Sequence, residues 1–242
     1  MILFGNTPDE LFDAPVSEHP WPGRLLIWII KAILQVWTRI YWPWTCDGPS
    51  PYRPTPQGER GRVFIANHSS MIDPVLLVIK AMGTGCVVRP IYKSEFDSNK
   101  IITWFFARVG AIPVKRASAD MKVIKRTVNA LKRGENVLVF PEGQRVWDPA
   151  ERPEVYGGYA LMAQMAGADI VPIAIDGAER INYKKQHLIP RPARIRIRFG
   201  EPISFDDVEG ENKREKAAAM ERLGMERVYA MREELRSELA SK

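Results

Sequence analysis

Short apolar runs alternate with helical patterns from Arg62 to Phe199, and this alternation restricts the possible fold more than any other feature. Strands are predicted at 62–66, 86–91, 111–114, 136–140, 169–175 and 194–199. Helices are predicted at 71–82, 99–109, 119–132 and 156–166. Strands that alternate with helices pack together as layers. We therefore expect an α/β fold with a single domain, in which a central mixed sheet is flanked by helices.

Residues 21–44 differ from the rest of the chain because they are rich in tryptophan and aliphatic residues. Lys31, Gln35 and Arg39 are spaced to lie along one helical face, and no uncharged run approaches the roughly 18 residues that a membrane span needs. Tryptophan and tyrosine favour the bilayer interface, and lysine and arginine extend to head groups. These features favour an amphipathic, membrane-associated helical segment that lies in the interface. A helix packed on the protein's own core is the alternative.

Three further segments surround the domain predicted at 62–205. Residues 1–20 are polar and contain proline without a clear period, so we expect an irregular N-terminal arm. Residues 45–61 are dense in proline and glycine, which predicts a linker. Residues 206–242 are rich in alanine, glutamate, methionine and arginine and predict a charged helical C-terminal tail with a largely solvated surface.

A histidine and an aspartate follow the first predicted strand of the domain, in the stretch NHSSMIDP. If Ser69 or Ser70 caps a helix, Asp73 returns close to His68 after about one turn. Asp73 would then accept a hydrogen bond from one ring nitrogen, and the other nitrogen would act as a general base on a substrate hydroxyl. A hydrogen-bonded histidine beside a helix-cap acid is the alternative explanation of the same spacing.

A second polar turn, FPEGQR, follows the predicted strand at 136–140. Gly143 allows close approach of a ligand to the backbone, and Arg145 can form forked hydrogen bonds to phosphate. Glu142 can accept from substrate hydroxyls. Strand ends in an α/β sheet meet in one crevice, so this turn is expected beside His68. A turn that carries only surface charges is the alternative.

Basic residues follow two other predicted strands. Lys115 and Arg116 come after the strand at 111–114, where a basic pair suits a phosphate site. Lys93 follows the strand at 86–91, and a cation there can stabilise a developing oxyanion. A surface ion pair between Lys93 and Glu95, and a solvated Lys115, are the alternatives.

Taken in order, these motifs resemble those of the glycerolipid acyltransferases of the 1-acylglycerol-3-phosphate acyltransferase type. The matching blocks are NHSSMID, GAIPVKR at 110–116, FPEGQR, and the proline-containing strand IVPIAI at 170–175. The resemblance implies that 62–205 is the catalytic domain, that His68 is the general base and that Asp73 is its partner. It also implies that Arg116, Glu142, Gly143 and Arg145 bind the acceptor, with Lys93 matching the family's Lys-x-Glu-Leu stretch more loosely.

The reaction that the resemblance implies is the transfer of a fatty acyl group from acyl-CoA or acyl-acyl carrier protein to the free hydroxyl of a lysophospholipid. The expected acceptor is 1-acylglycerol 3-phosphate, and the product is phosphatidic acid. No metal or bound cofactor is expected, because the thioester is already activated. We expect the protein to be peripheral or monotopic on the cytoplasmic face of a membrane.

Departures from the family motifs leave the acceptor open. Gln144 and Val146 replace the usual threonine and serine after FPEG, and the stretch at 155–158 lacks both lysines of the family's FKKG-like segment. A lyso-ornithine lipid, glycerol 3-phosphate or a glycolipid is the alternative acceptor for the same chemistry. A non-catalytic protein that binds anionic lipid is an alternative of another class.

The basic charge alone does not select a partner, because a net charge of +6 and a pI near 9.3 suit nucleic acid, anionic membranes or phosphorylated ligands. Nucleic acid is ranked last, since no motif of a nucleic-acid-binding fold is present. The arginines at 194, 196 and 198 alternate along a predicted strand and share one face, which suits anionic lipid, coenzyme A or plain solvent. The scattered histidines and two cysteines do not suggest a zinc site.

Overall fold

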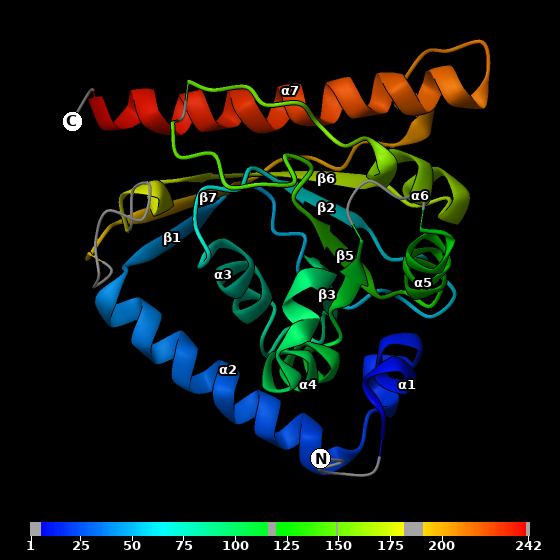
Figure 1. Ribbon diagram of the computed structural model, residues 1–242. Coiled ribbons are helices and arrows are strands. Elements are labelled where there is room, and N and C mark those ends of the chain that lie inside the picture. Colours follow the sequence, from blue (N-terminus) through cyan, green and yellow to red (C-terminus); the bar gives the residue numbers. More distant parts are fainter. Residues whose placement is uncertain (1–5, 116–119, 149, 182–190, 241–242) are drawn as a thin grey trace.

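Seven strands of the described residues form one sheet in the order β1-β7-β6-β2-β5-β3-β4 (Figure 1). The computed structural model describes residues 6–115, 120–148, 150–181 and 191–240. The strands are β1 (Trp44–Asp47), β2 (Val63–Ala66), β3 (Val88–Lys93), β4 (Ile112–Val114), β5 (Asn136–Val139), β6 (Ile170–Asp176) and β7 (Ile195–Phe199). Neighbouring strands are parallel except β6 and β7, so the sheet is mixed, as predicted.

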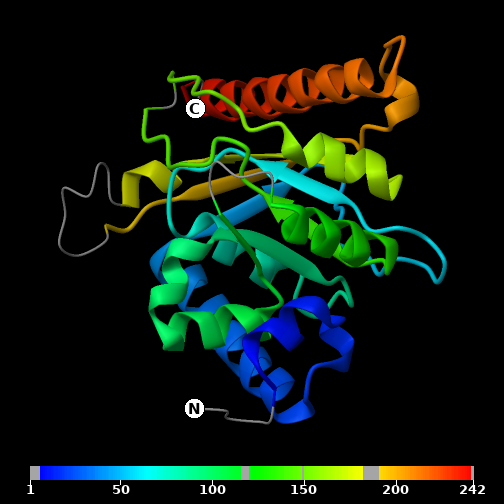
Figure 2. The same ribbon diagram turned by 45° about the vertical axis from the view of Figure 1, so that its right-hand side comes forward.

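Helices cover both faces of the sheet. The longer ones are α2 (Trp21–Tyr41), α3 (Asp73–Lys80), α4 (Lys100–Val109), α5 (Met121–Lys132), α6 (Gly158–Ala166) and α7 (Lys213–Ala240). Helices α5, α6 and α7 lie on one side, and α2, α3 and α4 lie on the other (Figures 1 and 2). The α/β layers predicted from the alternation of patterns are therefore confirmed.

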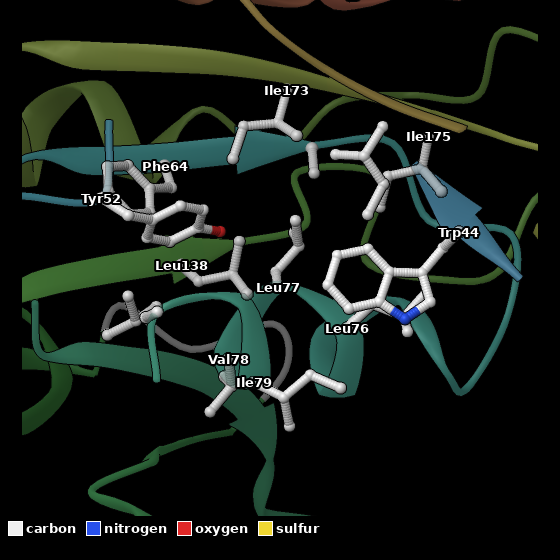
Figure 3. Close-up of a cluster of buried hydrophobic side chains, with 14 of the residues drawn as sticks. Trp44, Tyr52, Phe64, Leu76, Leu77, Val78, Ile79, Leu138, Ile173 and Ile175 are labelled. Atoms are coloured by element: carbon white, nitrogen blue, oxygen red, sulfur yellow. The ribbon is translucent and has the colours of Figure 1, made fainter. Parts of the chain in front are cut away.

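The side chains of the central strands β2, β5 and β6 divide between two apolar clusters. Figure 3 shows the cluster on the α3 side, where Phe64 and Leu138 of the sheet meet Leu76 and Leu77 of α3. On the other side, Val63 and Ile65 pack against helices α5 to α7. Successive residues of a strand point to opposite faces, so β2 contributes to both clusters and its four residues are all buried. This burial on both sides holds the end of β2 in place.

The N-terminal arm is more ordered than the sequence predicted. Helix α1 (Pro8–Asp13) begins with a capping box: the side chain of Thr7 accepts a hydrogen bond from the backbone N–H of Glu10, and the side chain of Glu10 accepts one from the backbone N–H of Thr7. Its Leu11 and Phe12 are buried against Ala107 of α4. Within 1–20, the expectation of an irregular arm is wrong here, because six residues are too few to display a helical period.

The predicted linker at 45–61 also contains structure. Strand β1 runs into it and pairs with β7 at the edge of the sheet, and its Trp44 is almost fully buried. Further along, the ring of Tyr52 packs edge-on against Phe64 and Phe199. Proline and glycine in this segment therefore shape a packed connection and not a free linker.

The C-terminal helix differs from its prediction in where it lies. Helix α7 packs lengthwise over the sheet and buries Met220, Met225, Val228 and Leu235 (Figure 1). Strand β7 is an inner strand whose arginines are engaged within the protein. Arg198 pairs with Asp47 of β1 and with Glu234 and Glu238 of α7, and Arg196 binds the carbonyl of Leu235. These two arginines hold α7 on the sheet. They are therefore bonded within the protein and do not form the open face for lipid or coenzyme A that the sequence suggested.

Candidate active site

Four neighbouring parallel strands end at the same edge of the sheet. They are β2, β5, β3 and β4 in that order, and the residues that follow or end them include His68, Glu142, Lys93 and Lys115. Adjacent strands lie about 4.8 Å apart, so this edge forms a row of polar residues about 15 Å long. The topology therefore gathers residues that are far apart in the sequence.

The first pair in this row is His68 and Asp73. The Nδ1 of His68 lies 3.0 Å from Oδ2 of Asp73, whose side chain is 0% exposed. The same carboxylate oxygen accepts from the backbone N–H groups of Ser69 and Ser70, each at 2.7 Å. Because the carboxylate accepts the proton on Nδ1, a neutral imidazole leaves Nε2 unprotonated. The ring keeps 17% exposure, so the contact holds a partly exposed imidazole in a fixed orientation at this edge.

The helix that carries Asp73 begins differently from the prediction. Helix α3 starts at Asp73 itself, with Ile72 in the capping position and no side-chain cap. The predicted serine cap is wrong, because the aspartate reaches back to the loop instead. The predicted contact between His68 and Asp73 is nevertheless present, since the loop folds around the carboxylate.

Asn67 attaches the base-bearing loop to the next strand. Its side-chain amide donates to the carbonyl of Ile175 and its oxygen accepts from the N–H of the same residue, both at 2.8 Å. Asn67 is completely buried, so these bonds also satisfy its polar atoms. The end of β2 is thereby fixed against β6, immediately before His68.

The turn after β5 supports His68 from the other side. The N–H of His68 donates to Oε2 of Glu142 at 2.7 Å, and the N–H of Val146 donates to the His68 carbonyl at 2.7 Å. The ring of Phe140 lies 4.4 Å from the imidazole, centroid to centroid. Both backbone groups of His68 are therefore held, one by the FPEGQR turn and the other by Val146, which directly follows it.

Glu142 is deeply buried, and burial raises the pKa of its carboxyl group above the usual range. Its second oxygen accepts from the hydroxyl of Tyr229 at 3.1 Å. The structure thus places Glu142 beneath His68, with hydrogen bonds that position the base. The role of Glu142 in acceptor binding that the resemblance implied stays a prediction.

A cavity of about 150 Å³ lies beside this turn and is lined by Glu142, Gln144, Glu154 and Tyr156. Gly143 has a positive φ of 61°, and a Cβ there would come within 2.7 Å of the ring of Tyr156. Glycine is therefore required both by the backbone and by the close aromatic ring. The lining is acidic and polar, which distinguishes it from a phosphate site.

The predicted cations that the structure describes come from strand ends other than that of β2. Arg145 is half-buried in the same turn, with its guanidinium carbon 5.4 Å from the centre of the Trp147 ring. Lys93 ends β3, two strands from β2, which corresponds to about 10 Å across the sheet. Arg116 lies outside the described residues. Lys115, just before it, is exposed after β4.

The acyltransferase family model matches residues 49–176 of the chain. The protein belongs to this family. The motif resemblance noted in the sequence is therefore confirmed, and the matched region of this acyltransferase includes His68, Asp73 and the whole FPEGQR turn.

The chain is also similar to curated proteins whose names state an activity. A Bacillus subtilis 1-acyl-sn-glycerol-3-phosphate acyltransferase is 30% identical over 167 residues, covering 67% of this chain and 76% of that protein. A Streptococcus pneumoniae enzyme of the same name is 29% identical over 173 residues, with 70% and 61% covered. A Pseudomonas aeruginosa lyso-ornithine lipid O-acyltransferase is 29% identical over 129 residues, covering 52% of this chain and 48% of that protein.

The chain spans less than two thirds of the length of several relatives, including 61% of the Streptococcus pneumoniae enzyme and 42% of a chloroplastic 1-acyl-sn-glycerol-3-phosphate acyltransferase from Brassica napus. A crystal structure of the 1-acyl-sn-glycerophosphate acyltransferase PlsC from Thermotoga maritima aligns with a TM-score of 0.66 and 20% identity. The alignment covers 88% of this acyltransferase and 79% of the other chain, and it shows a shared fold.

Sequence reasoning missed one residue of the acyltransferase site, Tyr229. It lies in α7, far from every motif, and reaches the site only because α7 docks on the sheet. The helix was predicted as solvated, so no feature of the sequence marked this tyrosine. Its aromatic ring also receives the guanidinium of Arg152 at 4.4 Å, which connects α7 to the segment after the turn.

Proposed function

We propose that this protein transfers a fatty acyl group from a thioester to the free hydroxyl of 1-acylglycerol 3-phosphate, giving phosphatidic acid. The observation that carries the proposal is the buried Asp73 carboxylate on Nδ1 of a partly exposed His68, at the sheet edge where the basic strand ends converge. The named relatives of the same activity support the acceptor.

In this mechanism Nε2 of His68 removes the proton from the acceptor hydroxyl while the oxygen attacks the thioester carbonyl. The new C–O ester bond forms and the C–S bond breaks, and the imidazolium returns the proton to the leaving thiolate. Asp73 keeps the ring in the required tautomer and stabilises its charged form. The thioester supplies the activation, so the balance requires no metal or bound cofactor. Acyl-CoA and acyl-acyl carrier protein both provide such a donor.

The phosphate of the acceptor needs cations at some distance from the hydroxyl. We place it toward Arg145, Lys93 and Arg116, which the topology or the sequence puts at or after the ends of β5, β3 and β4. The ring of Tyr156 packs against Gly143, so the glycerol moiety would approach the turn beside that ring. Glu142 acts through His68 by holding its backbone N–H.

The acceptor and product are amphiphiles, and we propose that the protein reaches them on the membrane surface. Large apolar side chains of α2 remain exposed, namely Trp21, Leu25, Trp28, Ile29, Ile33, Val36, Trp37 and Ile40. The helix that carries these exposed side chains runs along the outside of the molecule (Figures 1 and 2). Exposed apolar patches of this kind mark membrane or protein contacts. No helix of the described residues is long and apolar enough to span a bilayer.

This outward apolar side, which we call the α2 face, suits peripheral or monotopic binding. Acyl-CoA and acyl carrier protein are intracellular donors, so we place the protein on the cytoplasmic side. Aliphatic and tryptophan side chains together match the interface between head groups and acyl chains.

One observation favours a second acceptor, a lyso-ornithine lipid. The cavity beside Gly143 is lined by Glu142 and Glu154, with no basic residue among its described lining. Such a lining attracts an ammonium group and repels a phosphate. The Pseudomonas aeruginosa relative carries the corresponding name. The chemistry at His68 would be the same.

The test is acceptor-dependent thiol release from palmitoyl-CoA by the purified protein, with 1-acylglycerol 3-phosphate and lyso-ornithine lipid in parallel. We expect release with the phosphate acceptor, and a fall of about 10²–10⁴-fold in His68→Ala, because a general base contributes that much. Faster turnover of the lyso-ornithine lipid would replace the acceptor and keep the mechanism.

Met71→Ala is the matched control for His68→Ala, because Met71 lies in the same loop with its side chain exposed. It should keep wild-type turnover. Full acceptor-dependent release by His68→Ala that is folded, as judged by an unchanged melting temperature, would contradict the mechanism.

A further inference from the structure

A second cavity, of about 330 Å³, lies between α2, the end of α3 and the start of β3. We call it the α2–α3 cavity. Its lining includes Val88, the first residue of β3, whereas Lys93 ends this strand at the edge that carries His68. A strand rises about 3.3 Å per residue, so about 16 Å separates the cavity from the catalytic edge. The α2–α3 cavity is therefore distinct from the site described above.

Three cations line the α2–α3 cavity, Arg24 and Lys31 from α2 and Arg108 from α4. The described lining residues include no carboxylate. Arg24 donates to the carbonyl of Ser17 at 2.7 Å, and the guanidinium carbon of Arg108 lies 4.2 Å from the centre of the Trp104 ring. The remaining lining is mainly aliphatic, as at Ile27, Val78 and Met82. The cavity thus combines positive charge with apolar walls.

Lys31 is the cation whose surroundings are least satisfied. It forms no ion pair with any acid in the part of the chain that the structure describes. Burial lowers its pKa, and no neighbouring charge offsets that effect. A desolvated ammonium group without a counter-charge is costly to keep. An anion in the cavity would offset this cost, and so the geometry favours an anionic ligand.

The position of the cavity on α2 indicates where that anion comes from. Arg24, Trp28 and Lys31 lie at i, i+4 and i+7 and so share one flank of the helix. Leu25 and Ile29 of the α2 face lie on the adjoining surface. A bilayer that receives the α2 face would bring its phosphate groups level with this flank, while its acyl chains stay in the membrane.

We propose that the α2–α3 cavity binds the phosphate headgroup of an anionic glycerophospholipid of the bilayer. The proposal rests on the proposed membrane association of α2 and deepens it from a general attraction to a defined site. Phosphatidic acid, the product of the proposed reaction, belongs to the same lipid class. The site therefore orients the protein on membranes that contain such lipids, with the catalytic edge at a fixed distance from the bound headgroup.

The experiment compares binding to vesicles of phosphatidylcholine alone with binding to vesicles that also contain phosphatidylglycerol. Wild-type protein is expected to prefer the anionic vesicles. Lys31→Met, which keeps the chain length and removes the charge, should lose about tenfold of that preference, more than the roughly fivefold that one lysine contributes through non-specific attraction. Lys125→Met is the matched control, because it removes the same charge from an exposed position on α5.

Equal losses in Lys31→Met and Lys125→Met would overturn the proposal, because they would show attraction by net charge only. Full competition by inorganic phosphate would also overturn it, since the site would then take a soluble anion. In the absence of lipid, Lys31→Met should raise the melting temperature by removing a desolvated charge, whereas a lysine with a purely structural role would give a decrease.

Acyl transfer is measured separately on the wild-type protein with detergent-dispersed substrates. Wild-type protein that lacks acyl transfer but keeps the Lys31-dependent vesicle preference would refute the proposed activity and support the site. Wild-type protein that transfers acyl groups but binds both kinds of vesicle equally would refute the site and support the activity.

Discussion

Helices α2 and α7 are the two long helices that border the sheet, and they expose opposite kinds of surface. Helix α2 has 21 residues and α7 has 28, and they lie on opposite faces of the sheet (Figure 1). The outward side of α2 is aliphatic and aromatic, whereas the exposed residues of α7 are largely charged. Both helices bury enough apolar surface to dock. The exposed apolar surface of α2 is therefore additional to what the core requires.

The two helices also differ in what they contribute to the catalytic edge. Tyr229 of α7 reaches Glu142 under His68, while α2 packs against α3 and α4 on the other face. Helix α7 therefore supports the site, whereas α2 carries the proposed contact with the bilayer.

The strongest test places one charge on each helix. Val228→Asp in α7 buries a carboxylate at a position that is 0% exposed, and we expect a loss of about 4 kcal/mol or more in the free energy of unfolding. Ile33→Asp in α2 lies at a position that is 63% exposed and should change stability by less than about 0.5 kcal/mol. Urea titration of both variants measures this. Similar losses would remove the distinction between the helices.

The α2 face is tested by three substitutions made together, Ile29→Ser, Ile33→Ser and Val36→Ser. Removing these side chains from a bilayer contact should weaken vesicle binding by about 100-fold, or about 2.7 kcal/mol, because each buried aliphatic side chain contributes about 1.5 kcal/mol or more and the contact is partial. Flotation with vesicles measures the loss.

The matched control for the α2 variant lies on α7, where Glu226→Ser and Arg227→Ser change exposed residues. Vesicle binding by this control should equal that of the wild-type protein. A comparable loss in both variants would indicate that the bilayer does not distinguish the two helices.

Tyr229→Phe tests the support that α7 gives to the catalytic edge. It removes one hydrogen bond to a buried carboxylate, and we expect kcat/KM to fall about five- to tenfold, corresponding to about 1.0–1.4 kcal/mol. The pH profile gives a second readout. The Tyr229 hydroxyl favours the ionised form of Glu142, so its loss raises the pKa of that carboxyl group further.

The raised pKa of Glu142 makes the stability of the protein depend on pH. Its pKa in the folded protein lies above the ordinary value of 4.5, so the stability contributed by its environment falls as the pH rises from about 4.5 through the folded pKa. The variant should extend this window upward and move the acid limb of the activity profile to higher pH. An unchanged profile with reduced stability would mean that Tyr229 has only a structural role.

The smallest expected change in stability comes from the contacts that attach each helix to the region of β1. Arg198 joins α7 to β1 through ion pairs, and Arg39 of α2 stacks on Trp44 with its guanidinium carbon 3.7 Å from the ring centre. Each alanine variant should lose about 0.5–1 kcal/mol. At about 1 M salt the loss in Arg198→Ala should nearly vanish through screening, and the loss in Arg39→Ala should persist. Thermal unfolding at two salt concentrations measures both.

The elements and contacts that depend on residues close together in the sequence were predictable. The strands and helices from Val63 to Ala166 appear close to their expected positions, because each has a clear period or a glycine boundary. The contact between His68 and Asp73 was also predicted, since five residues separate them and a loop can bring them together. The meeting of strand ends followed from parallel pairing.

Features that depend on docking were not predictable. Helix α7 places the charged Arg232 among its buried apolar residues, so the sequence did not mark its inner side as an apolar face. The bond from Tyr229 to Glu142 and the pairing of Arg198 both require α7 in place. Likewise, β1 gains its partner only from a strand far along the chain, and its few residues lie where proline and glycine predicted a connection.

The pairing of β1 with β7 has a consequence for the order in which the protein folds. Asp47 of β1 and its ion-pair partner Arg198 are 151 residues apart, so during synthesis the edge strand waits for nearly the whole chain. Contacts of such long range form late and slowly. Helix α2, which leads directly into β1, is therefore made well before its strand can be locked into the sheet. The membrane contact proposed for α2 would therefore be able to form in that interval, before the edge strand completes the sheet.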